Sequence, residues 1–129
     1  MNSGIIVDTT VWIEFLRNSN SELSNHLKLL LRQGRVIMVG IILAEILQGV
    51  KLAKERNRLT DLFKNLPYLE ITRSNWEKAG DLESTLRKKG ITIPLSDLII
   101  ASAAVSGNIE VYTIDPHFRS IPRVRLYHP

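Results

Sequence analysis

Four acidic residues stand where the sequence makes a charge expensive. Asp8 directly follows the apolar run IIV, and Asp115 follows a second β-rich run in VYTID. Glu45 lies inside the apolar segment GIILAEILQGV, and Asp97 directly precedes LIIASAAVS. A buried ion without a partner costs several kcal/mol. None of the four has an obvious basic partner beside it in sequence, so the fold or a ligand must supply one.

A divalent cation would relieve the repulsion among clustered carboxylates. The chain has no cysteine, so any metal must be held by oxygen or histidine ligands, and oxygen ligands favour Mg²⁺ or Mn²⁺. One or two such ions can activate a water molecule and neutralise the charge that develops on a phosphodiester. The acidic set therefore predicts metal-dependent phosphodiester hydrolysis.

Each acid also has a simpler interpretation when it is taken alone. Asp97 could be a helix N-cap, and Asp115, which precedes Pro116, could be a turn residue. Glu45 could be half of a salt bridge, and Asp8 could bind backbone N–H groups at a strand end. Only the combination of two strand-end acids with two acids in apolar helices favours a shared metal site.

Short β-rich runs alternate with helical patterns along the chain, which predicts a mostly parallel sheet with helices on both faces. The predicted strands are Ile5–Val7, Val36–Val39, Tyr68–Ile71, Glu110–Thr113 and Val124–Tyr127. In such sheets, ligands bind beyond the carboxyl ends of the strands, where the strand order reverses. If the first and fourth strands are neighbours there, Asp8 and Asp115 converge.

Capping residues and glycines predict the ends of the first helices. Ser21 can cap a helix that runs to Arg32 and ends before Gly34. A helical pattern over residues 41–66 follows, and Gly49 is the expected place for a break.

Two further helices are expected in the second half of the chain. Ser74 and Glu77 match the S-x-x-E capping box, which predicts that a helix begins there. Ser96 or Asp97 is expected to open the last long helix, and Gly107 is expected to end it. A helix this apolar should be buried, so its N-terminus would point toward the interior.

Length and composition are typical of one compact domain. The chain has 129 residues, of which 44% are hydrophobic, so we expect a single domain over residues 1–129. It has no apolar run of roughly 20 residues and no signal-peptide pattern at its N-terminus, so we expect a cytoplasmic protein without membrane contact. The net charge of +4 suits an anionic partner such as nucleic acid.

Four segments together resemble the PIN-domain ribonucleases, and specifically the small VapC-type toxins of type II toxin–antitoxin systems. They are IIVDTTVWIEFL, LAEILQGV, PLSDLIIASAAV and YTIDPHFRSI, and they occur in the family's order over nearly the whole chain. The resemblance implies four catalytic, metal-holding acids with two hydroxyl neighbours. The acids are Asp8, Glu45, Asp97 and Asp115, and the neighbours are Thr10 and Thr113.

The resemblance also implies a fold and partners. The expected fold is a single PIN-like α/β domain with a five-stranded, mostly parallel sheet of order 3-2-1-4-5, flanked by helices. The expected activity is Mg²⁺- or Mn²⁺-dependent endoribonuclease cleavage of RNA. The expected partners are a cognate VapB-type antitoxin and a second copy of the chain in a homodimer.

Other conspicuous residues allow more than one interpretation. His117 could shuttle a proton or could position the turn after Asp115. Trp12 and Phe15 lie one helical turn apart, which favours core packing or a dimer face over base stacking. Several basic residues could line the acidic site and hold phosphates, although each could equally be a solvated surface residue. They are Arg17, Lys51, Lys54, Arg56, Arg119 and Arg123.

Two rival functions stay open at this point. A phosphoaspartyl phosphatase or receiver domain would use Asp8 as nucleophile or phosphate acceptor, but DTT lacks the second aspartate of the common DxD motif, and Glu45 would have no role. A non-catalytic module of the same fold could bind RNA or protein. A test for Mg²⁺-dependent cleavage separates the module from the nuclease.

Overall fold

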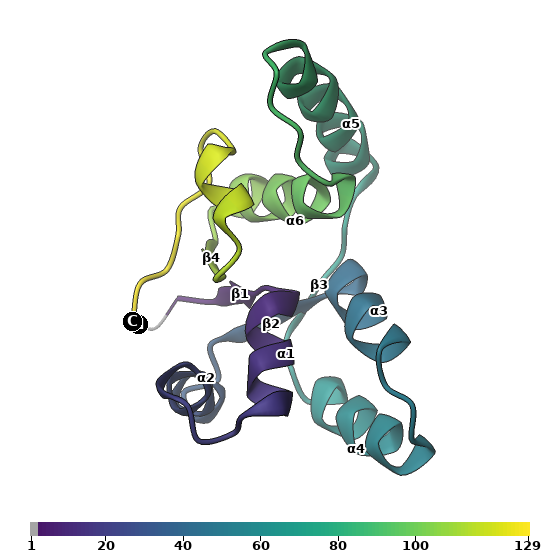
Figure 1. The fold of residues 1–129 in the computed structure, drawn as a ribbon, viewed down its shortest axis with the longest axis vertical. Helices are drawn as coiled ribbons and strands as arrows, with labels where there is room; N and C mark the ends of the chain where they lie inside the picture. The colour runs from purple at the N-terminus through teal and green to yellow at the C-terminus, as the bar shows by residue number, and fades with distance from the viewer. Residues whose placement is uncertain (1–2) are drawn as a thin grey trace.

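The computed structural model of the chain describes residues 3–129 and has a four-stranded parallel sheet at its centre (Figure 1). The strand order is β3-β2-β1-β4, and all three pairings are parallel. The strands are β1 (Ile5–Val7), β2 (Val36–Val39), β3 (Tyr68–Leu69) and β4 (Glu110–Tyr112). The predicted α/β class and the order of the first four strands are confirmed.

The register of the central strands sets up the carboxyl edge of the sheet. Ile5 pairs with Glu110 and Val7 with Tyr112, so β1 and β4 end at the same level. The first residue after β1 extends this alignment, because the Asp8 N–H donates to the Tyr112 carbonyl at 2.9 Å. All three residues of β1 are fully buried, which is typical of a parallel strand covered on both faces.

Helices cover the sheet from two sides. Figure 1 shows α6 and the 3-10 helix η1 on one side of the sheet, and α1, α2 and α4 on the other. Among the described helices, none is long and apolar enough to cross a membrane. The helices are α1 (Thr9–Arg17), α2 (Glu22–Arg32), α3 (Gly40–Gln48), α4 (Ala53–Lys64), α5 (Arg73–Lys88), α6 (Leu95–Ser106) and η1 (Pro116–Ser120).

The predicted fifth strand, Val124–Tyr127, is wrong. This segment makes one isolated parallel bridge, between Val111 and Leu126. The Val111 N–H donates to the Arg125 carbonyl at 2.9 Å and the Tyr127 N–H donates to the Val111 carbonyl at 2.8 Å, but the ladder goes no further. Arg123 has a φ of 69°, which lies outside the extended region and limits the ladder at this end. Side chains also fasten the segment. The Tyr127 hydroxyl lies 2.8 Å from His26 Nε2, and the two rings stack.

Most predicted helix ends are found within a few residues of their places. Ser21 caps α2 by accepting from the Ser24 N–H, and Gly34 follows that helix with a φ of 68°, a conformation that favours glycine. The helical pattern after β2 breaks after Gln48, so α3 and α4 are separate helices joined by residues 49–52.

The predicted Ser74–Glu77 capping box is wrong, because α5 begins at Arg73 and its N-cap is Thr72. Thr72 Oγ1 accepts from the Asn75 N–H at 3.2 Å, and Asn75 Oδ1 accepts from the Thr72 N–H at 3.0 Å. A tertiary contact decides between the two candidates. The Asn75 side chain is buried and donates to Ser106 Oγ at 2.9 Å, which ties the start of α5 to the end of α6.

The last long helix begins earlier than predicted. Its first residue is Leu95 and its N-cap is Pro94, so neither Ser96 nor Asp97 opens it. The interpretation of Asp97 as an N-cap is therefore wrong, and the residue lies in the first turn of α6. The end at Gly107 is confirmed, as is the burial of this helix, since residues 97–104 are all buried.

The two candidate caps of α5 can be separated by stability measurements. Thr72→Ala removes one half of the capping box and should lower the free energy of unfolding by about 1 kcal/mol. Ser74→Ala is the matched control, and at this exposed position it should change that energy by less than about 0.5 kcal/mol. Urea unfolding monitored by circular dichroism measures both, and a larger loss for Ser74→Ala would contradict the observed cap.

Candidate metal-binding active site

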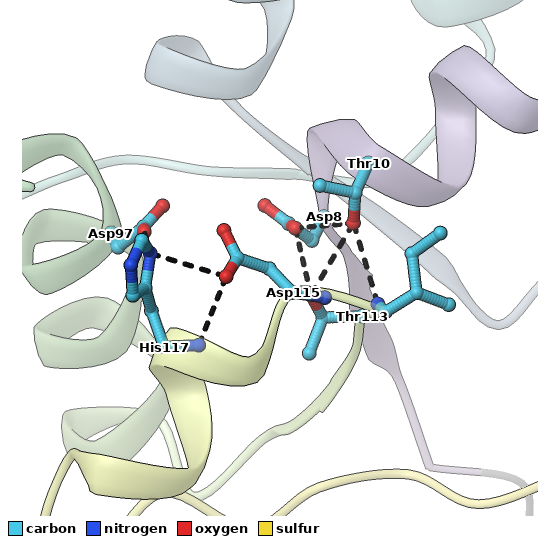
Figure 2. A network of polar contacts seen from close by, with 7 residues as sticks. Asp8, Thr10, Asp97, Thr113, Asp115 and His117 are labelled. Atoms are coloured by element: carbon cyan, nitrogen blue, oxygen red, sulfur yellow. Dashed lines mark hydrogen bonds and ion pairs between the residues drawn. The ribbon is translucent and has the colours of Figure 1, made fainter.

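Three of the four predicted acids converge beyond the carboxyl ends of the central strands. Asp8 follows β1, Asp115 follows the neighbouring β4, and Asp97 lies in the first turn of α6. Figure 2 shows the three carboxyl groups turned toward a common space. The parallel pairing of β1 with β4 and the burial of α6 together produce this arrangement.

Two hydroxyl groups hold Asp8, which is only 2% exposed. Its Oδ2 accepts from Thr10 Oγ1 at 2.7 Å and from Thr113 Oγ1 at 2.8 Å. No described residue donates to Oδ1, which leaves that oxygen available to a ligand. The alternative in which the Asp8 carboxylate binds backbone N–H groups is wrong for the residues described, because its side chain makes no capping hydrogen bond.

Asp115 is both a turn residue and a member of the acidic cluster. Its Oδ1 accepts from the His117 N–H at 2.9 Å, which caps the 3-10 helix η1. Its own N–H donates to Thr113 Oγ1 at 2.9 Å. The same threonine hydroxyl therefore touches both Asp8 and Asp115, and it fixes their relative positions.

Asp97 experiences the repulsion within the cluster most directly. Its side chain is only 12% exposed. Burial, followed by the charges of Asp115 and Asp8, raises the pKa of Asp97 from 3.8 to about 6, although His117 partly opposes this rise. Bringing the three acids together is therefore costly without a cation, as expected for a site that holds one.

Glu45 lies beside the cluster rather than among its closest ligand atoms. It projects from α3, and its Oε1 accepts from Thr9 Oγ1 at 2.8 Å, so it is tied to the residue that follows Asp8. No ion pair to Glu45 occurs within residues 3–129, so the salt-bridge interpretation is wrong for the described chain. Of the four predicted acids, three converge, and the fourth is hydrogen-bonded to Thr9, the residue after Asp8.

His117 lies beside the acidic cluster, and the sequence could not predict where its side chain points. Its Nδ1 lies 3.1 Å from Asp115 Oδ1 and 3.4 Å from Asp97 Oδ2. One ligand atom from each of these three residues lies within 4.8 Å of the others. The only signal in the sequence was its position two residues after Asp115, across Pro116.

The other residues singled out in the sequence have different surroundings. Trp12 is fully buried and makes an edge contact with Phe63 at 5.2 Å between ring centroids, so core packing is confirmed and base stacking is excluded for it. Arg17 and Lys51 line a cavity that also contains Glu45, whereas Arg123 lines a separate cavity between α5 and α6. Arg123 is therefore separate from Arg17 and Lys51.

The donor set fits a hard divalent cation. Three carboxylates provide oxygen ligands, and their mutual repulsion is the charge that a cation would neutralise. Asp8, Asp97 and Asp115 come from separate elements, so the folded chain, and no local segment, assembles the site. Fold and site together define a small α/β protein with a candidate cation site built on carboxylates.

Comparison with known proteins identifies the family. Residues 5–124 match the PIN domain family, and the chain belongs to it. It is 26% identical over 126 residues to Ribonuclease VapC2 of Rickettsia felis, covering 94% of each chain. It is 27% identical over 124 residues to Ribonuclease VapC11 of Mycobacterium tuberculosis, covering 93% of this chain and 92% of that one.

Solved structures agree over the same length. VapBC2 from Rickettsia felis, bound to a DNA fragment from its promoter, matches with a TM-score of 0.79 and 25% identity over 95% of this chain and 96% of that chain. DNA-bound VapBC from Salmonella typhimurium matches with a TM-score of 0.81 and 25% identity over 97% of both chains. The whole described fold is thus shared with these proteins.

The elevated pKa of Asp97 predicts a pH-dependent stability difference. With the folded-state pKa raised to about 6, the folded protein keeps a proton that the unfolded chain releases above about pH 4, so its stability falls as the pH rises through this window. Asp97→Asn does not titrate. In the presence of a chelator, it should therefore be more stable than the wild type by up to about 3 kcal/mol near pH 8, and by little below about pH 4.

Urea unfolding across this pH range measures the difference between the two proteins. Asp81→Asn, at an exposed position on α5, is the control and should show no such trend. A gain for Asp97→Asn that is the same at every pH would mean that the cluster does not cause it.

Proposed function

We propose that this PIN-domain protein is a metal-dependent endoribonuclease that hydrolyses RNA phosphodiester bonds. The convergence of Asp8, Asp97 and Asp115 at the carboxyl edge of the sheet is the observation that carries the proposal. The relatives that match almost the full chain are named ribonucleases, which supports the same activity here. In this proposal, residues 1–129 form one PIN domain, and the protein acts in the cytoplasm.

Mg²⁺ or Mn²⁺ is the proposed cofactor. Asp97 and Asp115, which offer ligand atoms within 4.8 Å of each other, would hold it together with the free Oδ1 of Asp8. Glu45, which accepts a hydrogen bond from Thr9 beside Asp8, would act from the edge of the same site. When bound, such a cation lowers the pKa of a water molecule and neutralises charge on the phosphate. All four predicted acids thus keep a role in the proposed reaction, with Glu45 further from the cluster than the other three.

The chain's own residues orient the acids and admit the substrate. Thr10 and Thr113 lock one oxygen of Asp8, so its other oxygen has a fixed direction. The N-terminal turn of α6 carries the partial positive charge of a helix N-terminus beside Asp97, which favours an approaching phosphate. The His117 side chain is 45% exposed, so the cluster is open to solvent on that side.

The two rival functions fit the structure less well. A phosphoaspartyl mechanism would leave Glu45, which is hydrogen-bonded to Thr9 beside Asp8, without a role, and DTT lacks the second aspartate of the common DxD motif. A non-catalytic binding module would gain nothing from Asp97, whose pKa is raised by burial and then by its acidic neighbours. Intact acids therefore favour catalysis, and the cleavage assay below decides between enzyme and module.

A VapB-type antitoxin is the proposed partner, and the chain is the proposed toxin of the pair. A cavity of about 520 Å³ lies between α1, α3 and α4 and contains the acidic Glu45. Two of its apolar residues are strongly exposed, Ile13 at 44% and Leu52 at 68%. An antitoxin segment could cover these side chains and place a basic residue against the carboxylates, where it would compete with metal or RNA.

The homodimer implied by the family resemblance stays a prediction. A separate apolar face supports it, because Tyr68 is 51% exposed and Trp76 is 50% exposed. Both residues line a cavity with Gly40 and Ile41, away from the α1–α3–α4 cavity. A second copy of the chain would bury this face without blocking the proposed antitoxin site.

The nuclease proposal predicts metal-dependent cleavage of RNA by the purified protein. Single-stranded or loop RNA should be cut with Mg²⁺ or Mn²⁺ and left intact with a chelator. Asp8→Asn should lower the rate by about two orders of magnitude or more, because it removes a charged ligand from the centre of the cluster. Asp81→Asn, which removes an exposed acid from α5, should cut at the wild-type rate. Undiminished cleavage in a chelator would refute the metal mechanism.

The partner proposal predicts that a surface change separates toxin neutralisation from catalysis. Leu52→Asp places a charge in the α1–α3–α4 cavity, so it should weaken antitoxin binding roughly tenfold or more and leave RNA cleavage unchanged. Val105→Asp, at an exposed apolar residue of α6 outside this cavity, is the control. Co-purification with the product of the neighbouring gene measures binding. If the wild type always emerges alone and its expression is harmless, the toxin assignment fails and the nuclease proposal stands.

A further inference from the structure

His117 presents a nitrogen atom to the acidic cluster at ligand-to-ligand spacing. Its Nδ1 lies 3.1 Å from Asp115 Oδ1 and 3.4 Å from Asp97 Oδ2. Adjacent ligands of an octahedral ion with bonds of about 2.1 Å lie about 3 Å apart. We propose that His117 is a nitrogen ligand of the cation and that it makes this site prefer Mn²⁺ to Mg²⁺. The inference rests on the proposed metal-dependent function.

The local turn holds the imidazole in this position. The backbone N–H of His117 donates a hydrogen bond to Asp115 Oδ1. Pro116, which lies between the two residues, has a restricted φ angle. The next residue, Phe118, is only 1% exposed and anchors the turn in the core. With its backbone fixed on both sides, His117 keeps its ring beside the two carboxylates and does not need to move far to bind a cation.

The second ring nitrogen leaves Nδ1 free to coordinate. Within residues 3–129, His117 Nε2 has no hydrogen-bond partner, and 45% of the side chain is exposed. Without a cation, Nδ1–H can donate to the carboxylates beside it. When a cation binds, this proton would leave, and water could then accept the hydrogen kept on Nε2, so that the Nδ1 lone pair is free to coordinate. A histidine ligand often has its other nitrogen hydrogen-bonded in this way.

Imidazole changes which cation the site selects. Mg²⁺ prefers oxygen ligands and keeps several water molecules, whereas first-row transition metals accept imidazole nitrogen readily. Mn²⁺ combines tolerance for carboxylates with a higher affinity for nitrogen than Mg²⁺ has. Two carboxylates and one imidazole within 4.8 Å therefore favour Mn²⁺ over a purely oxygen-binding ion.

Electron paramagnetic resonance on the full-length protein with Mn²⁺ tests the inference without any activity measurement. Free Mn²⁺ gives the affinity, and electron spin-echo modulation from ¹⁴N reports directly on a coordinated imidazole. His117→Asn replaces Nδ1 by an amide oxygen or nitrogen of similar reach, and it should remove the ¹⁴N modulation. It should also weaken Mn²⁺ binding by about tenfold or more and affect Mg²⁺ binding, measured by competition, much less.

His128→Asn provides the matched control, because His128 is an exposed histidine outside the group formed by Asp97, Asp115 and His117. It should leave both the modulation and the Mn²⁺ affinity unchanged. If the wild type binds Mn²⁺ with no ¹⁴N modulation and His117→Asn binds equally well, the inference is overturned and the carboxylate site survives. If the wild type binds neither Mn²⁺ nor Mg²⁺, the inference and the proposed metal-dependent function fall together.

Discussion

The parallel pairing of β1 with β4 is the constraint on which the site depends. These strands are far apart in sequence, and their register brings Val7 level with Tyr112, so both strands end at the same point of the sheet edge. The hydrogen bond from the Asp8 N–H to the Tyr112 carbonyl continues the pairing by one residue. A slip of one residue would turn every side chain of β1 to the opposite face and would separate the two acids that follow the strands. The ladder therefore fixes the catalytic geometry as well as the core.

The acidic cluster shows how a fold can tolerate groups that repel. Thr113 binds Asp8 through its hydroxyl group and accepts the Asp115 N–H, so neutral hydrogen bonds hold two of the acids in place. Asp97 has no such support from a hydroxyl group among the described residues, and burial, followed by the charges of Asp115 and Asp8, raises its pKa. It lies in the first turn of a helix whose dipole favours a negative charge, which offsets part of this cost.

The sequence was sufficient for the elements whose signals are local. Ile5–Val7 and Val36–Val39 were predicted with their observed bounds because each is a continuous apolar run with a glycine at one end and a charged residue at the other. The cap of α5 could not be predicted from local motifs, because the buried contact of Asn75 with Ser106 selects it. The fifth strand failed for a related reason, since its backbone hydrogen bonds reach Val111 alone and Arg123 before it has a φ of 69°, neither of which the apolar pattern of the segment shows.

The sequence was enough to name the four candidate acids, but it predicted only in part which of them lie together. Strand-end positions brought Asp8 and Asp115 together as expected, because carboxyl ends of parallel strands share one edge. The displacement of Glu45 toward Thr9 depends on how α3 packs against α1, which periodicity does not specify. The orientation of His117 depends on a capped turn and on the burial of Phe118, so it also required the folded structure.

The order of the site residues along the chain has a consequence for synthesis. Asp8 is made 107 residues before Asp115 (115 − 8). At about 5–20 residues per second, the ribosome needs roughly 5–20 seconds to pass from the first acid to the last. The C-terminal segment that bridges to Val111 and stacks Tyr127 on His26 is made later still. The acidic cluster therefore cannot be complete until Asp115 has been made, so a growing chain carries no assembled candidate site during those seconds.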